Sequence, residues 1–390
     1  MADAVIVSAA RTPIGRAYKG SLAGVDAFAL ARVVVGAVLA RSGVPTADID
    51  DLVLGESLQG GGVIARHTAV SLGLTGVPGL ADNRHCAAGL SALQIAAAGI
   101  LAGMDRVVVA GGTESLSTMP AARRRGVPGG ELEDWMSPSH PGTPDAPAFD
   151  MAVTVGENTA REAGLTRRDV DEWAVYSHGR AVASIDSGAF ADEIVPVPIA
   201  PEGAGAAEFR VDEHPRRGVT LERLSALKPV HPELADATVT AGNAAGLNDA
   251  AAAVLVVDAD YARAHGLTAL ARVRSWASAA VEPARTGMAP TVAIPKALGR
   301  GGLTVRDIAL WEINEAFCAV PLAVSRGLGI RHEILNVNGS GCSLGHPVAA
   351  TGTRMVVTML GELRRRGESL GCVSMCAGGG MASALVLELL

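Results

Sequence analysis

Residues 48–56 read Asp-Ile-Asp-Asp-Leu-Val-Leu-Gly-Glu, and residues 307–315 read Asp-Ile-Ala-Leu-Trp-Glu-Ile-Asn-Glu. Both stretches open on Asp-Ile, continue into an apolar run typical of a buried strand and close on Glu. Cys86 follows the first Glu by 30 residues, and His346 follows the second by 31. A helical pattern and a second apolar run ending in glycines come after each of them. Two matched segments about 259 residues apart predict an internal duplication.

The duplication predicts that residues from both halves meet. Equivalent loops of a duplicated fold lie around a pseudo-twofold axis. Cys86 of the first half can therefore meet His346 and Cys376 of the second, and Cys376 lies 30 residues beyond His346. A thiolate nucleophile needs a base or a cationic partner, so this meeting favours nucleophilic chemistry.

The composition indicates a large protein without a nucleic-acid footprint. A chain of 390 residues is long enough for two or three domains and a large core. The formal net charge of -7 argues against a nucleic-acid partner, which requires a basic surface. A local basic patch for an anionic ligand remains compatible with this charge.

The same composition gives an expected location. No apolar run reaches the ~18–20 residues of a membrane span. Residues 1–7 lack the basic segment of a signal peptide and are expected to form a first strand. Five cysteines without framework spacing indicate a reduced, cytoplasmic protein that does not bind a membrane.

Strand-like runs alternate with helical patterns along much of the chain. This alternation predicts α/β layers with mainly parallel sheets. The expected strands are 4–7, 52–54, 107–110, 253–257, 271–273, 310–313, 372–375 and 384–387, and the expected helices include 27–40, 90–101 and 352–363.

Residues from about 118 to 240 differ, and we interpret them as an insertion after the core of the first half. Residues 123–148 are rich in Pro and Gly and show little periodicity. A helix is expected over 173–190, a short edge strand over 192–197 and a loop followed by a helix over 216–228. The inserted loops either cover a ligand or form an irregular surface subdomain.

Cys86 directly precedes an Ala-rich helical pattern. The positive end of a helix dipole lowers the pKa of a nearby thiol and makes the thiolate available. A small buried cysteine is the alternative, and it is the commonest role of a free cysteine. The local sequence alone leaves both open.

His346 and Cys376 also have two interpretations each. A histidine beside a proline is usually structural, although the matched position of His346 favours a partner for Cys86. Cys376 precedes Gly378 and its neighbours, which allow a close backbone approach and N–H groups aimed at an oxyanion. A tight turn between two strands explains these glycines equally well.

Asn314 follows a strand of the buried type, where it either caps a turn or orients a water. Cys372 and Cys376 have a Cys-x-x-x-Cys spacing, yet no second ligand pair accompanies them. A zinc site is therefore not expected.

Taken in order, these motifs resemble those of thiolases, the acyl-CoA C-acyltransferases, over essentially the whole chain. The blocks are Val-Ile-Val-Ser-Ala-Ala-Arg-Thr-Pro-Ile-Gly at 5–15, Cys-Ala-Ala-Gly at 86–89, Gly-Gly-Thr-Glu-Ser-Leu-Ser at 111–117, Asn-Glu-Ala-Phe at 314–317, Gly-His-Pro at 345–347 and Cys-Ala-Gly-Gly-Gly at 376–380. The resemblance implies an α/β thiolase-like fold with two duplicated core domains in five layers (αβαβα) and an inserted loop domain. The implied division is 1–117 with 241–264, then 118–240, then 265–390.

The resemblance implies a two-step Claisen condensation, which runs backwards as CoA-dependent thiolysis of a β-ketoacyl-CoA. His346 would deprotonate Cys86, which takes an acyl group from an acyl-CoA. Cys376 would exchange a proton with the α-carbon of a second acyl-CoA, whose enolate attacks the acyl-enzyme. Asn314 would hold a water that stabilises the enolate together with His346 Nε2. Backbone N–H groups of Cys86 and Gly378 would bind the tetrahedral intermediate.

The resemblance also implies CoA contacts in the inserted region. Arg216 matches a position near the nucleotide end, and Met151 matches one near the acyl and pantetheine pocket. A solvated arginine and a core methionine are the alternatives. Ala245 stands where thiolases commonly have a serine near the pantetheine. CoA is substrate and product, so no metal or redox cofactor is implied.

Four positions carry a larger residue where thiolases commonly have glycine. An added Cβ matters where the backbone needs a positive φ or a close approach. We therefore hypothesise a shifted acyl preference. The positions are Ala250, Ser340, Ala349 and Ala382.

Two other functions stay open. A ketoacyl synthase of the same broad fold pairs its nucleophilic cysteine with His-His or His-Asn and lacks the second cysteine, so Cys376 and Asn314 favour a thiolase. A catalytically weak thiolase-like protein could bind acyl-CoA as a scaffold, although intact Cys86 and His346 oppose this. Thiolases form dimers, or tetramers through a hairpin in the inserted region, and residues 123–147 look too irregular to decide between the two.

Overall fold

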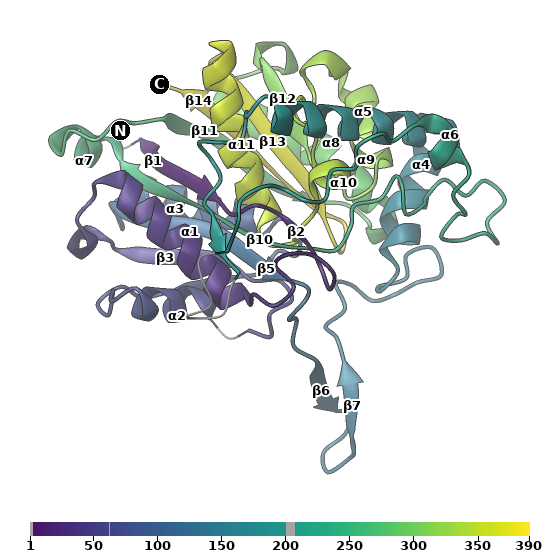
Figure 1. Cartoon of the computed structure of the whole chain (residues 1–390), viewed down its shortest axis with the longest axis horizontal. Helices are drawn as coiled ribbons and strands as arrows, with labels where there is room; N and C mark the ends of the chain where they lie inside the picture. The colour runs from purple at the N-terminus through teal and green to yellow at the C-terminus, as the bar shows by residue number, and fades with distance from the viewer. Residues whose placement is uncertain (1–2, 62, 200–206) are drawn as a thin grey trace.

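The computed structural model describes residues 3–61, 63–199 and 207–390 (Figure 1). Within them, ten strands form one sheet in the order β12-β13-β14-β11-β1-β10-β5-β3-β4, with β2 paired to β10. The strands are β1 (Ala4–Arg11), β2 (Gly15–Arg16), β3 (Asp51–Gly55), β4 (Leu80–Asp82), β5 (Val107–Ser115), β6 (Ala122–Arg125), β7 (Leu132–Trp135), β8 (Val197–Pro198), β9 (Glu208–Phe209), β10 (Asn248–Asp258), β11 (Ala271–Ala280), β12 (Leu310–Ile313), β13 (Leu370–Ala377) and β14 (Met381–Leu389).

The helices range from single turns to the 20-residue α5. They are α1 (Ala27–Ser42), α2 (Ile64–Ser71), α3 (Ala88–Leu101), α4 (Asn158–Glu162), α5 (Arg167–Asp186), α6 (Leu221–Ser225), α7 (Ala259–Ala264), α8 (Pro290–Gly301), α9 (Ala319–Leu328), α10 (Gly341–Leu344) and α11 (Thr351–Arg366). Short 3₁₀ helices are η1 (Thr46–Asp48), η3 (Pro283–Met288), η4 (Val305–Asp307) and η5 (His332–Ile334), and η2 (Ala152–Glu157) is a π-helix.

The two halves of the sheet repeat one pairing pattern, as the internal duplication predicts. In the first half β1 pairs antiparallel with β10, β10 antiparallel with β5, and β5 parallel with β3. In the second half β11, β14, β13 and β12 follow the same order with the same directions. The matched sequence segments form equivalent elements, a 3₁₀ turn followed by β3 or β12. Within the sheet, the two halves are joined by two residue pairs between the described strands β1 and β11.

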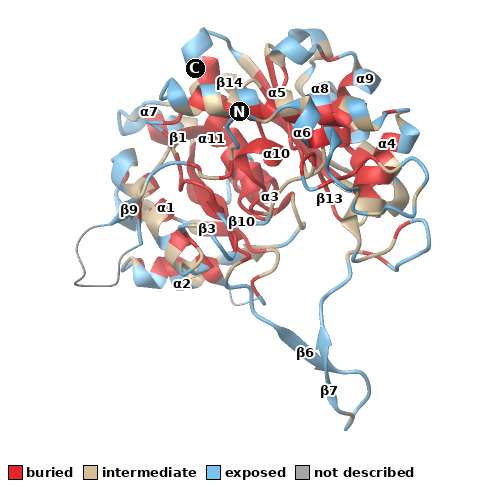
Figure 2. Ribbon diagram, turned by 45° about the vertical axis from the view of Figure 1, so that its right-hand side comes forward, coloured by how far each residue is buried: buried red, intermediate tan, exposed pale blue. Residues whose placement is uncertain are grey.

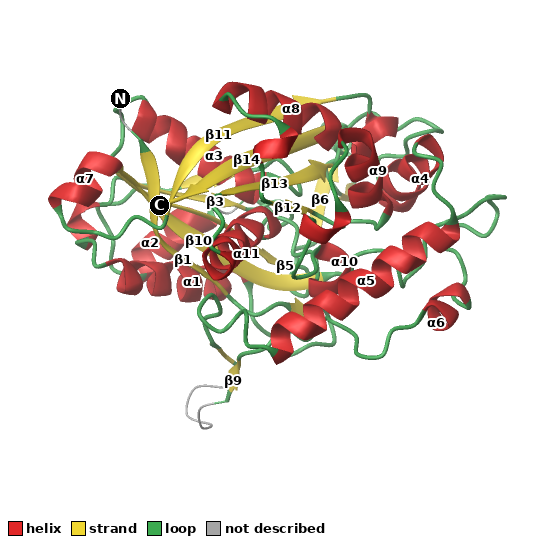
Figure 3. Cartoon of the chain, turned by 90° about the horizontal axis from the view of Figure 1, so that it is seen from above, coloured by secondary structure: helices red, strands yellow, loops and turns green. Residues whose placement is uncertain are grey.

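Helices and sheet halves alternate in five layers, which confirms the expected thiolase-like architecture. Helices α3 and α11 contact each other and lie between the two halves, where a buried cluster surrounds them. Helices α1 and α2 cover the outer face of the first half, and α8 and α9 cover that of the second. Figure 3 shows α11 in the middle of this arrangement with α8 and α1 on opposite sides.

The sheet directions differ from the prediction of mainly parallel strands, which was wrong. Only three pairings of the large sheet are parallel, β3 with β4, β3 with β5 and β12 with β13. The reason is that the last strand of each half, β10 or β14, runs antiparallel to both of the strands beside it. Chain segment 378–380 turns β13 directly back into β14, and β10 comes back after the long inserted segment.

The inserted segment is more regular than the sequence suggested. Strands β6 and β7 pair as an antiparallel hairpin that projects from the body of the molecule (Figure 1), and every residue of both strands is exposed (Figure 2). The prediction of an irregular segment there was wrong, because exposed strands carry no apolar alternation. The strand expected over 192–197 is wrong over most of its length. Residues 192 and 193 form a turn, Ile194 makes a single bridge to Arg11, and a strand (β8) begins only at Val197.

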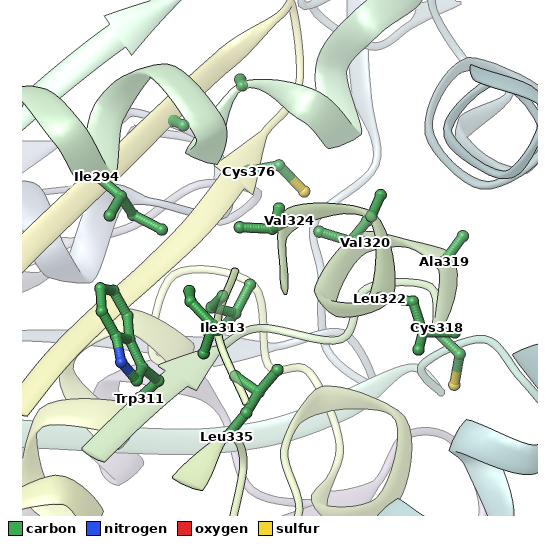
Figure 4. Packing of buried hydrophobic residues seen from close by; sticks show 14 of the residues in the cluster. Ile294, Trp311, Ile313, Cys318, Ala319, Val320, Leu322, Val324, Leu335 and Cys376 are labelled. Carbon is green, nitrogen blue, oxygen red and sulfur yellow. The ribbon is translucent and has the colours of Figure 1, made fainter. Parts of the chain in front are cut away.

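Close packing fixes the ends of the strands that reach the candidate site. Trp311 and Ile313 of β12 pack with Leu335 and with Val324 of α9 (Figure 4). Cys376, near the end of the neighbouring strand β13, belongs to the same buried cluster. The residues that directly follow β12 and β13 are therefore attached to closely packed strands.

Candidate active site

Cys86 lies in a tight turn between β4 and α3. The N–H of His85 donates to Asn83 Oδ1 at 2.9 Å, and His85 has a φ of +46°, in the left-handed region. The N–H of Ala88 donates to the His85 carbonyl at 3.0 Å. This turn leaves Cys86 half-buried, directly before the first turn of α3.

The glycine turn after Cys376 reaches this thiol from the other half of the chain. The backbone N–H of Gly378 donates a hydrogen bond to the Cys86 thiol. Gly379 and Gly380 have φ values of +83° and +78°, and a Cβ on Gly379 would stand 2.7 Å from the Ser139 carbonyl oxygen. Both sequence interpretations of the glycines therefore hold together: they make a tight strand-to-strand turn and present an N–H to the sulfur.

Of the two interpretations left open for Cys86, the free protein favours the protonated thiol. Burial raises the pKa of Cys86 to about 11, although the N–H groups of Gly378 and of Cys86 itself act in the opposite direction. A position before a helix does not offset the loss of water around the sulfur. Cys86 is therefore a thiol at neutral pH and needs a base at the moment of attack.

His346 has the form that such a base requires. Its Nδ1 lies 2.7 Å from Thr351 Oγ1, and the Thr351 hydroxyl lies 2.8 Å from the Pro347 carbonyl oxygen. A carbonyl can only accept, so Thr351 donates to Pro347 and accepts from His346 Nδ1–H. Burial, and secondarily Arg354, lowers the pKa of His346 to about 4. The imidazole is thus neutral, with the lone pair on Nε2.

Asn314 directly follows β12 and faces this imidazole. Its Nδ2 lies 3.5 Å from both ring nitrogens of His346. Its buried Oδ1 finds no hydrogen-bond partner within the described residues. A Cβ at Gly341 would stand 2.5 Å from that oxygen, so glycine is needed for the close approach. The geometry fits the predicted water-binding amide better than a simple turn cap.

Contact between α3 and α11 brings the two halves of the site together. Thr353 Oγ1 donates to the Gly89 carbonyl at 3.1 Å, and a Cβ on Gly89 would stand 2.6 Å from the Ala349 carbonyl oxygen. Burial, and secondarily Cys86, raises the pKa of Cys376 well above the usual range for a thiol. The second thiol therefore lies close to the first and is also protonated at neutral pH.

Of the three residues expected to contact CoA, Ala245 and Arg216 lie on loops, and Met151 lies at the start of the π-helix η2. Ala245 donates its N–H to the Ala316 carbonyl at 3.0 Å, two residues beyond Asn314. Arg216 is exposed, and its guanidinium lies 3.4 Å from the carbonyl oxygen of Ala241. Met151 is half-buried against the cluster of the second half, which fits a core role as well as a pocket role.

Three further residues hold the site in place and were absent from our sequence prediction. Thr351 orients the imidazole, and Asn248 Oδ1 accepts the His346 N–H at 2.9 Å. Buried Glu114 accepts from Gln59 Nε2 at 2.6 Å and from the Ala349 N–H at 3.1 Å. Burial raises the pKa of Glu114 to about 7. Glu114 lies inside the block 111–117. A carboxyl group within a run of buried type was the sequence signal that could have identified this residue.

The four positions that differ from the common glycine pattern are free of the expected backbone conflict. No residue among Ala250, Ser340, Ala349 and Ala382 has a positive φ. The Ser340 hydroxyl donates to Glu312 Oε1 at 2.9 Å, and Ala382 lies opposite Cys376 in the β13–β14 ladder. The substitutions are therefore accommodated, and Ala382 adds a methyl group beside the second thiol.

Neither a metal cluster nor a membrane-spanning helix occurs among the described residues. Residues 3–61, 63–199 and 207–390 hold no group of three or more His, Cys, Asp or Glu side chains arranged to bind a metal ion. No helix among the same residues has the length and apolar character needed to cross a membrane.

Comparisons with known proteins identify the family. The thiolase N-terminal domain matches residues 4–260 and the thiolase C-terminal domain matches residues 267–389. The chain is 42% identical to an acetyl-CoA acetyltransferase of Cupriavidus necator over 395 residues, covering 100% of both chains. It superimposes on the crystal structure of the Bacillus anthracis acetyl-CoA acetyltransferase with a TM-score of 0.92 and 38% identity, covering 100% and 99% of the two chains. For human mitochondrial 3-ketoacyl-CoA thiolase in complex with CoA, the TM-score is 0.90 and the identity 34%, with the same coverage. The chain therefore belongs to the thiolase family.

Proposed function

We propose that this protein is an acyltransferase that condenses two acyl-CoA molecules into a β-ketoacyl-CoA and cleaves β-ketoacyl-CoA with free CoA. The relatives that cover the whole chain are acetyl-CoA acetyltransferases and 3-ketoacyl-CoA thiolases. Acetyl-CoA and acetoacetyl-CoA are therefore the first substrates to test. The reaction is redox-neutral and moves only an acyl group and protons, so the proposal requires no bound cofactor.

Cleavage begins with proton transfer from the Cys86 thiol to His346 Nε2. The sulfur attacks the β-carbonyl carbon of the substrate, and the carbon–carbon bond breaks to release the enolate of acetyl-CoA. Cys376 gives its proton to the enolate carbon and becomes a thiolate. The incoming CoA thiol then gives its proton to Cys376, and CoA sulfur takes the acyl group. Cys86 finally recovers its proton from His346, and condensation is the reverse sequence.

The hydrogen bond from the Gly378 N–H to the Cys86 thiol carries this proposal. An N–H that contacts the nucleophilic sulfur in the free protein lies where the acyl oxygen arrives after attack. The Cys86 N–H would complete that oxyanion site. Asn314, whose Oδ1 is unpartnered within the described residues, would hold the water that stabilises the enolate with His346 Nε2.

The protonation states of the thiols support the same assignment. A resting Cys376 thiol, maintained by burial, is the acid that cleavage needs. A ketoacyl synthase uses histidine or asparagine there, so two neighbouring thiols oppose that alternative. A scaffold protein would need neither the Cys86–Gly378 hydrogen bond nor an oriented His346, which opposes the second alternative.

The remaining parts of the proposal concern CoA, assembly and location. We propose that Arg216 and Met151 contact CoA from an inserted domain formed by 118–240, of which 200–206 lie outside the described residues, and that Ala245 contacts it from the adjoining segment 241–264. Residues 1–117 with 241–264 and residues 265–390 would form the two core domains. The exposed hairpin and the edge of β4, to which no other described strand pairs on its outer side, support a homodimer or homotetramer. A reduced cytoplasmic location follows from the cysteine pattern.

The test is cleavage of acetoacetyl-CoA with free CoA by the wild type and by Cys86→Ala and Cys376→Ala. Loss of a nucleophile or a general acid lowers the rate by factors on the order of a hundred or more. We expect turnover by the wild type and loss in both variants. Full activity of Cys86→Ala would contradict the proposed mechanism. An inactive wild type that still binds CoA would favour the scaffold alternative.

A further inference from the structure

The residue before the nucleophile is a histidine with open ring nitrogens. His85 is half-buried, and no described residue hydrogen bonds to its imidazole, although its backbone N–H and carbonyl are both bonded. Burial, and secondarily His140, lowers the pKa of His85, so its ring is neutral at physiological pH. A neutral imidazole offers one donor and one acceptor. The proposed reaction leaves this side chain without a role.

The imidazole lies beside Gly378, whose N–H would bind the acyl oxygen in the proposed reaction. A Cβ on Gly378 would stand 3.7 Å from His85 Cγ and 3.2 Å from Ser139 Cβ. Gly378 also donates its N–H to the Cys86 thiol. If the acyl oxygen accepts a hydrogen bond from that N–H, the first carbons of the acyl chain must pass His85 or Ser139. The side chains around Gly378 therefore decide which acyl chains fit.

His140 and Ser139 bond to each other and leave His85 as the available polar group. His140 Nε2 lies 3.0 Å from the Ala146 carbonyl oxygen, which only accepts, so Nε2 carries the proton. His140 Nδ1 must then accept from the Ser139 hydroxyl, at 2.8 Å. Both His140 nitrogens and the Ser139 proton are used within the protein. Of the two described side chains that lie nearest to a Cβ on Gly378, His85 is the one whose ring is free to donate.

We propose that His85 recognises an oxygen atom on the acyl chain, so that the enzyme prefers acyl groups bearing a hydroxyl or a carboxylate over plain alkyl chains. This inference rests on the proposed function and names its substrate class. A buried apolar chain would leave the imidazole desolvated without a partner, whereas an oxygenated chain pairs with it. A hydroxyl and a carboxylate share the acceptor oxygen, and the experiment separates them.

The test measures kcat/KM for thiolysis of three substrates of equal chain length: β-ketohexanoyl-CoA, ω-hydroxy-β-ketohexanoyl-CoA and β-ketoadipyl-CoA. The enzymes are the wild type, His85→Leu and His85→Asn. Leucine removes the hydrogen-bonding group at similar volume. Asparagine tolerates the left-handed backbone at this position and keeps a donor, so it controls for strain.

We expect the wild type to favour at least one oxygenated substrate over β-ketohexanoyl-CoA. His85→Leu should lower kcat/KM for that substrate about tenfold, the ratio expected from losing one hydrogen bond, and leave β-ketohexanoyl-CoA within about threefold. His85→Asn should keep part of the preference. A preference for β-ketoadipyl-CoA alone assigns a carboxylate, and one for the hydroxyl substrate alone assigns an alcohol.

The contrary outcomes are distinct from one another. Efficient cleavage of β-ketohexanoyl-CoA without any preference for the oxygenated substrates overturns this inference and leaves the proposed function standing. A preference that survives unchanged in His85→Leu overturns the role of His85. Failure to cleave all three substrates contradicts the proposed function and this inference together.

Discussion

Replacing Thr351 by valine tests whether the protonation of His346 is set by a single hydroxyl. Valine has nearly the same shape as threonine and removes only the hydrogen-bonding group. The Thr351 hydroxyl is buried and accepts from His346 Nδ1 at 2.7 Å. In Thr351→Val the ring either keeps a buried Nδ1–H without a partner or moves the proton to Nε2. The second form cannot deprotonate Cys86, because its lone pair is on the wrong nitrogen.

The expected loss follows from the desolvation of one buried donor. Leaving a buried N–H without a partner costs about 1–3 kcal/mol. Because about 1.4 kcal/mol corresponds to a factor of ten in rate, kcat/KM for acetoacetyl-CoA should fall about 5- to 150-fold. The affinity for CoA should change little, since Thr351 does not lie on the loops of Arg216 or Ala245.

The assay compares Thr351→Val with Thr351→Ser in steady-state thiolysis and in the rate of Cys86 acylation. Serine keeps the hydroxyl and should restore most of the activity, at the stability cost of one lost methyl group. Equal losses in the two variants would show that packing of the methyl group, and not the hydrogen bond, explains the effect. Wild-type acylation rates in Thr351→Val would refute the reasoning.

Three other changes have defined outcomes. Burial is the main cause of the raised pKa of Cys86, and the negative charge of Glu114 raises this pKa further. Glu114→Gln should therefore lower the pKa of Cys86 and shift the pH profile of Cys86 alkylation to lower pH. An unshifted profile would contradict this. Arg354→Met should lower the free energy of unfolding by about 3–5 kcal/mol in urea titrations, because it leaves buried Glu312 without its ion-pair partner. Adding Glu312→Gln to the same chain should recover part of this loss. Replacing residues 122–135 by a short Gly-Ser loop should reduce the assembly mass measured by light scattering if the hairpin joins subunits, and an unchanged mass would exclude that role.

The sequence predicted the large elements because their patterns are local. The repeated Asp-Ile segments identified β3 and β12, and the buried runs identified the central strands. Strand direction depends on where the chain returns, which no local pattern contains, so the prediction of mainly parallel sheets was wrong for the pairings of β10 and β14. The hairpin of β6 and β7 escaped prediction because both strands are exposed and lack apolar alternation.

The candidate site was predicted by residue type and position, but its electrostatics was not. Cys376 lies near enough to Cys86 to raise its own pKa further, and Gly89 after Cys86 contacts Thr353 and Ala349 in the segment that follows His346, so the two halves meet near these residues. A lowered pKa was one of the two interpretations left open for Cys86, and burial instead raises this pKa. Thr351 and Asn248 act through hydrogen bonds between segments far apart in the chain, such as Asn248 to His346. Such contacts follow from the three-dimensional fold and cannot be read from the spacing of residues along the sequence.

The most direct test of the account is the covalent intermediate on Cys86. The protein is mixed with acetyl-CoA in the absence of a second nucleophile, quenched in acid and examined by intact-mass spectrometry and peptide mapping. The account predicts one acetyl group on Cys86 in the wild type and in Cys376→Ala, and none in Cys86→Ala. Acetylation that persists in Cys86→Ala, or maps to another residue, would contradict the central claim.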